Sequence, residues 1–288
     1  MFFFSRKCFV LLPVFCLLFL FSQTVSAQEW RPVTPQELAL KASVVEPDAD
    51  AEAIFWEVRV DDNAESADLV MKHYVRVKIF NERGREKYSK IDIPYVKGMK
   101  VKDIMARVIK PDGTTVELNK NDVFDREIIK ADKVKVKAKS FAVPNIEPGV
   151  IVEYRYQEIQ RSTWANNMRM FFQHDIPIQN ITYFFRPASN AKYLTFNMSD
   201  NKFIKDKNGF YRVTMENVPA IKEEPQMPPT DEVRSWAMIY YWSDLKDTNA
   251  DFWSKAGGFI ASAFEIKDTL KPGKDLKNAA TEITAGAT

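Results

Sequence analysis

The stretch His73-Tyr74-Val75-Arg76-Val77-Lys78-Ile79 decides the fold class. Its odd positions are mostly apolar and its even positions are polar or amphipathic. Successive side chains of a β-strand point to opposite faces of a sheet, so an alternation of period two is typical of a strand. The stretch therefore predicts a half-buried strand, with one face in the core and the other in water.

The same alternation recurs between about residues 51 and 242. It is clear at residues 133–139 and at residues 150–157, where Val152 and Tyr154 share one face and Glu153 and Arg155 the other. Turn residues that tolerate positive φ separate the runs at 81–84, 111–113 and 208–209. No helical crossover of ten residues intervenes. We therefore expect a mainly β protein, an antiparallel β-sandwich over residues 51–242, either as one unit or as two β lobes that divide near residues 160–167.

Helical signals flank the β region. Thr34-Pro35-Gln36-Glu37 combines a capping Thr, a Pro at the first helical position and a Glu three residues after the cap, which predicts a short helix in a leading segment, residues 28–50. Residues 243–288 predict short C-terminal helices. There an apolar stripe recurs at helical spacing: Phe252, Trp253, Ala256, Phe259, Ile260, Ala263 and Phe264.

Residues 1–27 have the layout of a secretory signal peptide. Arg6 and Lys7 precede an apolar run, and small residues end the segment at Ala27. We expect cleavage after Ala27, with an uncleaved anchor as the alternative. No later stretch is apolar for long enough to span a membrane. We therefore expect an exported protein, periplasmic or extracellular, with no membrane span after signal cleavage.

Charge and cysteine content exclude several classes of function. The chain has 41 Lys and Arg against 39 Asp and Glu, and Arg6 and Lys7 belong to the predicted signal, so no basic excess favours a nucleic-acid partner. Both cysteines, Cys8 and Cys16, also lie in that segment. We therefore expect no cysteine chemistry, no cofactor and no metal site in the exported chain.

Two histidines are the remaining candidates for catalysis. We interpret His73 as a packed residue of its strand, since a lone histidine without a positioned partner is weak grounds for a catalytic base. His174 precedes Asp175, but adjacent strand residues point to opposite faces, so the pair does not automatically form a dyad. Residues Lys133, Lys135, Lys137 and Lys139 form one strand face, interpreted as solvated or as a protected edge strand, with an anion-binding surface as the alternative.

Two motifs carry a resemblance to a known family. They are Ile109-Lys110-Pro111-Asp112-Gly113-Thr114 and the stretch from Phe141-Ala142-Val143-Pro144 through Pro148-Gly149 to Tyr156. From about residue 51 to 242 the chain resembles the domain of unknown function found N-terminal to transglutaminase-like cores in exported bacterial proteins. The resemblance implies a β-sandwich. It also implies a downstream core with a Cys-His-Asp triad, and the chain has no residues at matching positions, so we expect no enzyme activity.

Two functions follow from this reading. The first is a non-catalytic accessory domain that orients a downstream transglutaminase-like core or another envelope protein or peptide, with residues 243–288 as the linker towards it. The alternative is a free-standing glycan- or peptide-binding module, for which exposed Trp164 and Tyr240 would be diagnostic. The apolar stripe at residues 252–264 should either fold back on the sandwich or drive self-association. The candidate interaction surface is Trp236, Tyr240, Trp242, Phe252, Trp253 and Phe259.

Overall fold

The structure is a computed structural model of the chain. It describes residues 30–62, 68–131, 134–161, 163, 165–198, 201–241, 249–263 and 273–285. The predicted signal peptide, residues 1–27, lies outside the described residues, as do Trp164 and Trp242.

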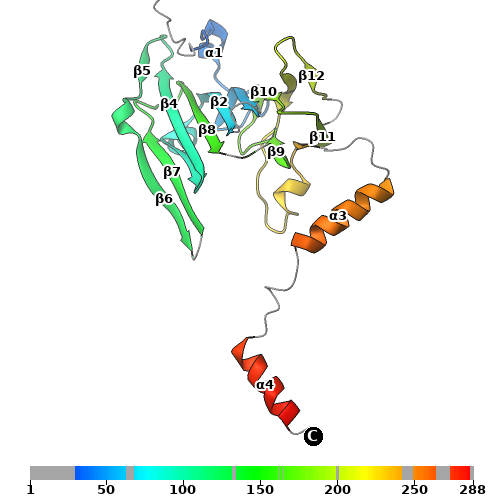
Figure 1. The fold of residues 1–288 in the computed structure, drawn as a ribbon. Coiled ribbons are helices and arrows are strands. Elements are labelled where there is room, and N and C mark those ends of the chain that lie inside the picture. The colour runs from blue at the N-terminus through cyan, green and yellow to red at the C-terminus, as the bar shows by residue number, and fades with distance from the viewer. Residues whose placement is uncertain are drawn as a thin grey trace, which may run out of the picture.

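The described residues contain fourteen strands in three sheets (Figure 1). The main sheet contains β1 (Ala51–Asp61), β2 (Asp68–Ile79), β4 (Met99–Ile109), β5 (Thr115–Glu117), β8 (Ile151–Arg161), β10 (Ile178–Arg186), β12 (Ile204–Lys205) and β13 (Tyr211–Val218). Its order is β12-β13-β10-β1-β2-β8-β4-β5. The β3-β7-β6 sheet contains β3 (Lys90–Val96), β6 (Phe124–Ala131) and β7 (Val134–Ala142). The β11-β14-β9 sheet contains β9 (Met168–Phe171), β11 (Ala191–Phe196) and β14 (Trp236–Tyr241).

Short helices connect or follow the strands. The α-helices are α1 (Pro35–Ala39), α2 (Glu82–Tyr88), α3 (Asn249–Ala263) and α4 (Lys274–Ala285), and the 3₁₀ turns are η1 (Lys120–Asp122) and η2 (Thr230–Glu232). The predicted start of α1 is confirmed, because Thr34 and Glu37 form a reciprocal capping box. The two C-terminal helices are confirmed as well, and Figure 1 shows them following the β region.

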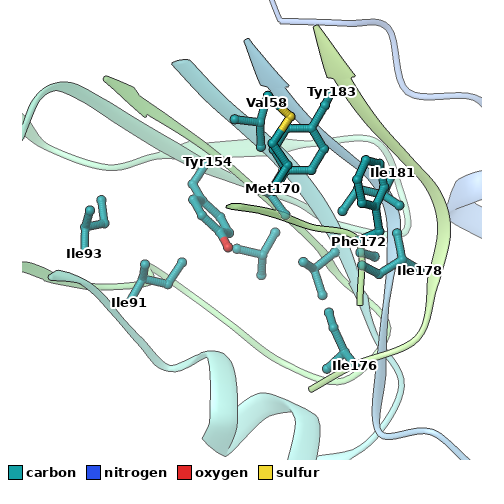
Figure 2. Packing of buried hydrophobic residues seen from close by; sticks show 14 of the residues in the cluster. Val58, Ile91, Ile93, Tyr154, Met170, Phe172, Ile176, Ile178, Ile181 and Tyr183 are labelled. Atoms are coloured by element: carbon teal, nitrogen blue, oxygen red, sulfur yellow. The ribbon is translucent and has the colours of Figure 1, made fainter. Parts of the chain in front are cut away.

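One face of the main sheet packs against both smaller sheets, which confirms the β-sandwich. Figure 2 shows Tyr154 and Ile181 of the main sheet in one group with Ile91 of β3, Met170 of β9 and Phe172, which follows β9. All of these residues belong to one cluster of buried apolar side chains. In the passage from β8 to β9, where a lobe boundary was considered, Ala165 is buried in this cluster whereas Asn166 and Asn167 are exposed, so a division into two lobes stays a prediction.

The expectation of a hairpin turn at residues 81–84 needs correction. Residues 81–84 do not form a hairpin turn; Asn81 caps α2 by accepting a hydrogen bond from the Gly84 amide, 3.1 Å away. Gly84 is needed for close packing instead of positive φ, since a Cβ there would lie 2.2 Å from the Asp50 carbonyl oxygen. The predicted turns at Gly113 and Gly209 are confirmed, with φ of 86° and 80°.

Strand pairing departs from the expected pattern at one place. β1 pairs with β10 in parallel, for example Val58 beside Tyr183, whereas the other strand pairs are antiparallel. More than 100 residues separate the two strands in sequence, so no local pattern could indicate this pairing.

The half-buried interpretation of β2 is wrong. Residues Tyr74 through Ile79 are all buried, the polar ones included. The cause is the leading segment, which crosses the second face of the main sheet. We call the face that carries Val75 and Val77 the apolar face, and the face that carries Arg76 and Lys78 the polar face.

Candidate functional site

The two β14 residues of the candidate interaction surface are partly buried. The Trp236 ring stacks on Phe196 at 5.4 Å, and its Nε1 donates a hydrogen bond to the Asp231 carbonyl oxygen at 2.7 Å. The Arg169 guanidinium lies 5.0 Å from the same ring. Tyr240 is half-buried on the same strand. Trp236 is thus engaged within the domain.

Three residues of that surface lie on α3. Trp253 is 70% exposed, and Ile260, which belongs to the same predicted apolar stripe, is 53% exposed. The side chains of Phe252 and Phe259 lie outside the described residues. We call the predicted apolar stripe, whose residues up to Ala263 lie on α3, the α3 stripe; whether it folds back on the sandwich or drives self-association stays a prediction. Because Trp242 also lies outside the described residues, the assembly of the six candidate residues into one surface stays a prediction as well.

Both histidines occupy packed positions on the apolar face. His73 stacks on Tyr156 with ring centroids 4.4 Å apart, and His174 stacks on Trp56 at 4.0 Å. Burial lowers the pKa of each histidine to about 4. Both rings are therefore neutral near pH 7. Asp175 forms an ion pair with Lys87 at 2.6 Å, and no hydrogen bond among the described residues joins it to His174.

One carboxyl group shares this environment. The Oε1 atom of Glu158 lies 3.7 Å from Nε2 of His73, and its side chain is 14% exposed. Burial raises the pKa of Glu158 to about 7. The pair is too long for a hydrogen bond and has no third group to orient it, so it lacks the geometry of a positioned acid–base catalyst.

The polar face holds a buried ionic cluster that the sequence analysis missed. Glu153 is fully buried and accepts hydrogen bonds from Arg76 at 2.7 Å, Arg107 at 2.6 Å and the Tyr74 hydroxyl at 2.6 Å. Arg76 lies directly opposite Glu153 in the pairing of β2 with β8. That complementary pair, at the polar positions of the two strands, was the signal available in the sequence.

The leading segment closes over this cluster and satisfies its remaining donors. Arg76 donates to the Glu37 carboxylate at 2.8 Å and to the Arg31 carbonyl oxygen at 2.7 Å. Lys78 donates to the Leu38 carbonyl oxygen at 2.8 Å. The Trp30 ring lies 4.7 Å from the Arg107 guanidinium and 4.4 Å from that of Arg155. The cluster therefore anchors the leading segment and offers no open charged group for catalysis.

The lysine face of β7 was interpreted as a solvated face or as a protected edge strand. β7 is the central strand of its sheet, so the edge-strand reading is wrong. Lys137 lies opposite Tyr95 and Lys139 opposite Ile93, whose side chain is 2% exposed. Directly opposed residues share a face, so the lysines continue the inner face of the sandwich. Lys137 and Lys139 are half-buried there, whereas Lys135 is exposed and Lys133 lies outside the described residues.

No group of three or more His, Cys, Asp and Glu side chains in the described part of the chain could hold a metal ion. None of the helices described is long and apolar enough to cross a membrane.

Comparison with known proteins gives a family and a fold. The model of a family described as "Domain of Unknown Function with solved-structure structure (DUF3857)" matches residues 66–222. The search of curated proteins returned no match. A crystal structure from Parabacteroides distasonis, described as "a putative protease", is 15% identical with a TM-score of 0.56, and the match covers 74% of this chain.

This chain corresponds to less than half of that protein, since the match covers 46% of its length. A structure of leukotriene A4 hydrolase from Saccharomyces cerevisiae is 7% identical with a TM-score of 0.33, over 66% of this chain and 29% of the hydrolase. At 15% identity the likeness to the Parabacteroides distasonis structure concerns the fold alone.

Proposed function

This chain belongs to the DUF3857 family of domains of unknown function, and from that premise we propose that it is a non-catalytic accessory domain that binds and orients a transglutaminase-like core. The core would lie on the same polypeptide or on a partner protein. We further propose that the domain acts outside the inner membrane, in the periplasm or beyond it, because residues 1–27 resemble a signal peptide.

The α3 stripe is the observation that carries this proposal. Trp253 and Ile260 are 70% and 53% exposed on a 15-residue helix that follows the sandwich. Exposed apolar patches in soluble proteins commonly mark interaction sites. A helix that presents an apolar stripe at the C-terminal side of the domain is placed to pack against a following or partner domain.

The chemistry of the domain supports a binding role over catalysis. Its cysteines are confined to positions 8 and 16. His73 and His174 are stacked against aromatic rings. The Arg76–Glu153–Arg107 cluster lies beneath the leading segment. A thiol nucleophile activated by a histidine, as in a transglutaminase-like triad, therefore has no counterpart among these groups.

Photo-crosslinking tests the binding role. Replacing Trp253 by p-benzoylphenylalanine keeps an aromatic side chain and adds a reactive group. In the native cells, irradiation is expected to join position 253 to a sequence that carries a Cys-His-Asp transglutaminase-like core, identified by mass spectrometry. The matched control places the same group at Tyr193, which is 41% exposed on β11 and should give no such adduct.

Adducts at position 253 that contain only a second copy of this chain, or only glycan, would contradict the accessory role.

Purified protein should neither cross-link nor hydrolyse glutamine-containing peptides, and turnover that disappears in His174→Ala would overturn the non-catalytic assignment. Mass spectrometry of the exported protein should find Gln28 as its first residue; Met1–Ala27 retained on membranes would contradict the cleaved signal.

A further inference from the structure

The inner face of the β3-β7-β6 sheet changes character along its length. Near the core it carries Ile91 and Phe141, which lie opposite one another and are both buried. Towards the β6–β7 hairpin the same face carries Tyr95 beside Lys137, and then Lys135. Figure 1 shows β6 and β7 running beyond the ends of β4 and β8. The sandwich therefore opens at this end, and lysines replace core residues where it opens.

Two hollows occupy the opening between β7 and β4. The first, of about 370 Å³, is lined by Tyr95, Val96, Lys97, Met99, Lys135 and Lys137. The second, of about 400 Å³, is lined by Val101, Lys102, Asp103, Ile104, Met105, Lys120, Val123 and Lys139. They follow one another along both strands, since Met99 precedes Val101 on β4 and Lys137 precedes Lys139 on β7. We call the two together the lysine cleft.

The lysine cleft carries an excess of positive charge. Lys139 forms an ion pair with Asp125 at 3.0 Å, and Lys135 pairs with Glu127. The other four lysines of the cleft form no ion pair with a described carboxylate, and they are Lys97, Lys102, Lys120 and Lys137. The six lysines thus outnumber three carboxylates, the third being Asp103 in the second hollow.

The arrangement of these lysines is regular. Residues two apart on a strand lie about 6.5–7 Å apart on the same face, so the backbone positions of Lys135, Lys137 and Lys139 are evenly spaced. An extended peptide has the same spacing between alternate side chains. The intervening side chains of such a peptide would point away from β7, towards Met99 and Val101 of β4, which are apolar.

We propose that the lysine cleft binds an extended acidic peptide segment of a partner protein, with carboxylates at alternate positions and apolar residues between them. Charge complementarity selects the carboxylates, and the strand spacing selects their alternation. The half-buried positions of Lys137 and Lys139 hold their stems against the sheet and reduce the conformational freedom lost on binding. This site is separate from the α3 stripe and does not depend on it.

Fluorescence anisotropy with two labelled peptides tests the proposal. The first peptide alternates Glu and Val over eight residues, and the second has the same composition with four Glu followed by four Val. The purified chain should bind the alternating peptide more tightly, by about fivefold or more at low salt, and added salt should weaken both. Equal binding of the two peptides would overturn the strand-spaced site.

Substitutions then locate the site. Lys97→Gln combined with Lys137→Gln removes two cations that have no described ion pair, so thermal stability should stay close to that of the wild type. Affinity for the alternating peptide should fall by about tenfold or more. Lys207→Gln in the β12–β13 turn removes an exposed charge elsewhere and should change affinity by less than about twofold. Similar losses in both variants would show general charge attraction and overturn the proposal.

A competitor distinguishes peptide from other anions. Heparin and inorganic phosphate should displace the alternating peptide only weakly at matched charge concentration. If heparin displaces it fully and itself binds with an affinity that depends on Lys97 and Lys137, the cleft is a glycan site and the peptide proposal is wrong.

Discussion

Val77 and Arg76 are neighbours on β2 and are almost equally buried, 0% and 2% exposed, on opposite faces of the main sheet. On the apolar face, burial removes hydrocarbon from water, which is favourable without any specific partner. On the polar face, each buried charge needs a counter-charge or a hydrogen-bond acceptor, and Glu153 and the leading segment supply them. The two faces of β2 are thus stabilised by different interactions, although both faces are buried.

The position of a carboxylate on one strand illustrates the same difference. Glu153 and Glu158 both lie on β8, five residues apart and therefore on opposite faces. Glu153 accepts hydrogen bonds from two arginines and a tyrosine. The His73 ring beside Glu158 is neutral near pH 7, and burial raises the pKa of Glu158 to about 7. The apolar face thus favours the protonated carboxyl group.

Glu153→Gln should have the largest effect, because it leaves Arg76 and Arg107 buried without their shared counter-charge. We expect the free energy of unfolding to fall by about 3–5 kcal/mol in urea denaturation. Converting the cluster to Arg76→Met, Arg107→Met and Glu153→Leu together should restore part of that loss, since these three charges are removed together and only the partly exposed Glu37 carboxylate loses its partner. A cost below about 1 kcal/mol for Glu153→Gln alone would show that the polar face depends little on its ionic cluster.

Glu158→Gln should stabilise the protein in a pH-dependent way. Because the pKa of Glu158 is raised from 4.5 to about 7, its contribution to stability is fully present below pH 4.5 and is lost as the pH rises through about 7. The variant should therefore gain on the wild type between pH 4.5 and 7, by up to about 3 kcal/mol on the alkaline side. Urea denaturation at pH 5 and pH 8 measures the gain, and an equal difference at both would contradict the raised pKa.

The contribution of His73 and His174 to stability has the opposite pH dependence to that of Glu158. Both histidines are present in the wild type and in Glu158→Gln. Their lowered pKa of about 4 means that their contribution is present above pH 6.5 and is lost as the pH falls towards 4. Their contribution should cancel in the difference between Glu158→Gln and the wild type. The wild type alone should lose stability as the pH falls from 6.5 to 4, to an extent that His174→Gln reduces.

Val77→Ala tests the apolar face directly beside Arg76. It removes two buried methyl groups, and we expect a loss of about 2 kcal/mol in the free energy of unfolding. The effect should be independent of pH and salt, unlike that of Glu153→Gln. A loss that exceeded the one from Glu153→Gln would reverse the ranking of the two faces.

Trp30→Ala should have the smallest effect. The Trp30 ring covers the guanidinium groups of Arg107 and Arg155, and losing these contacts should cost about 1–2 kcal/mol. Because the contacts hold one end of the leading segment, the change should be local. Hydrogen exchange of the Leu38 amide, which donates to the Thr34 carbonyl oxygen at 3.1 Å, should become faster while amides of β10 are unaffected.

Local elements were predictable from the sequence. Which segments cover each face of the main sheet was not. The capping box at Thr34, the turns at Gly113 and Gly209 and the stripe of α3 depend on neighbours within a few residues. An alternation of period two shows which side chains share a face, but it does not show what covers that face. The sequence alone therefore placed Arg76 on a solvated face. In the structure Arg76 is buried by the leading segment, which lies some 40 residues upstream.

The candidate site was predictable to a smaller extent. Trp253 and Ile260 were identified from helical spacing, and both lie on α3. The place of Lys137 and Lys139 on an inner face follows from β7 lying between β3 and β6, and that order is set by pairing across the chain. Sequence spacing could indicate their common face but not its direction.

The parallel pairing of β1 with β10 sets an order for folding of the main sheet. Strands β1, β2, β4 and β8 all lie before residue 162, so they can pair while the chain is still being made. The other edge of β1 stays open until Ile178–Arg186 has been synthesised and has closed a loop of more than 100 residues. A chain that stops before residue 178 would expose the unpaired amide and carbonyl groups of β1, a template for intermolecular strand addition. Termination of synthesis, or proteolytic cleavage of the chain, between residues 162 and 178 should therefore yield aggregates instead of a smaller folded domain.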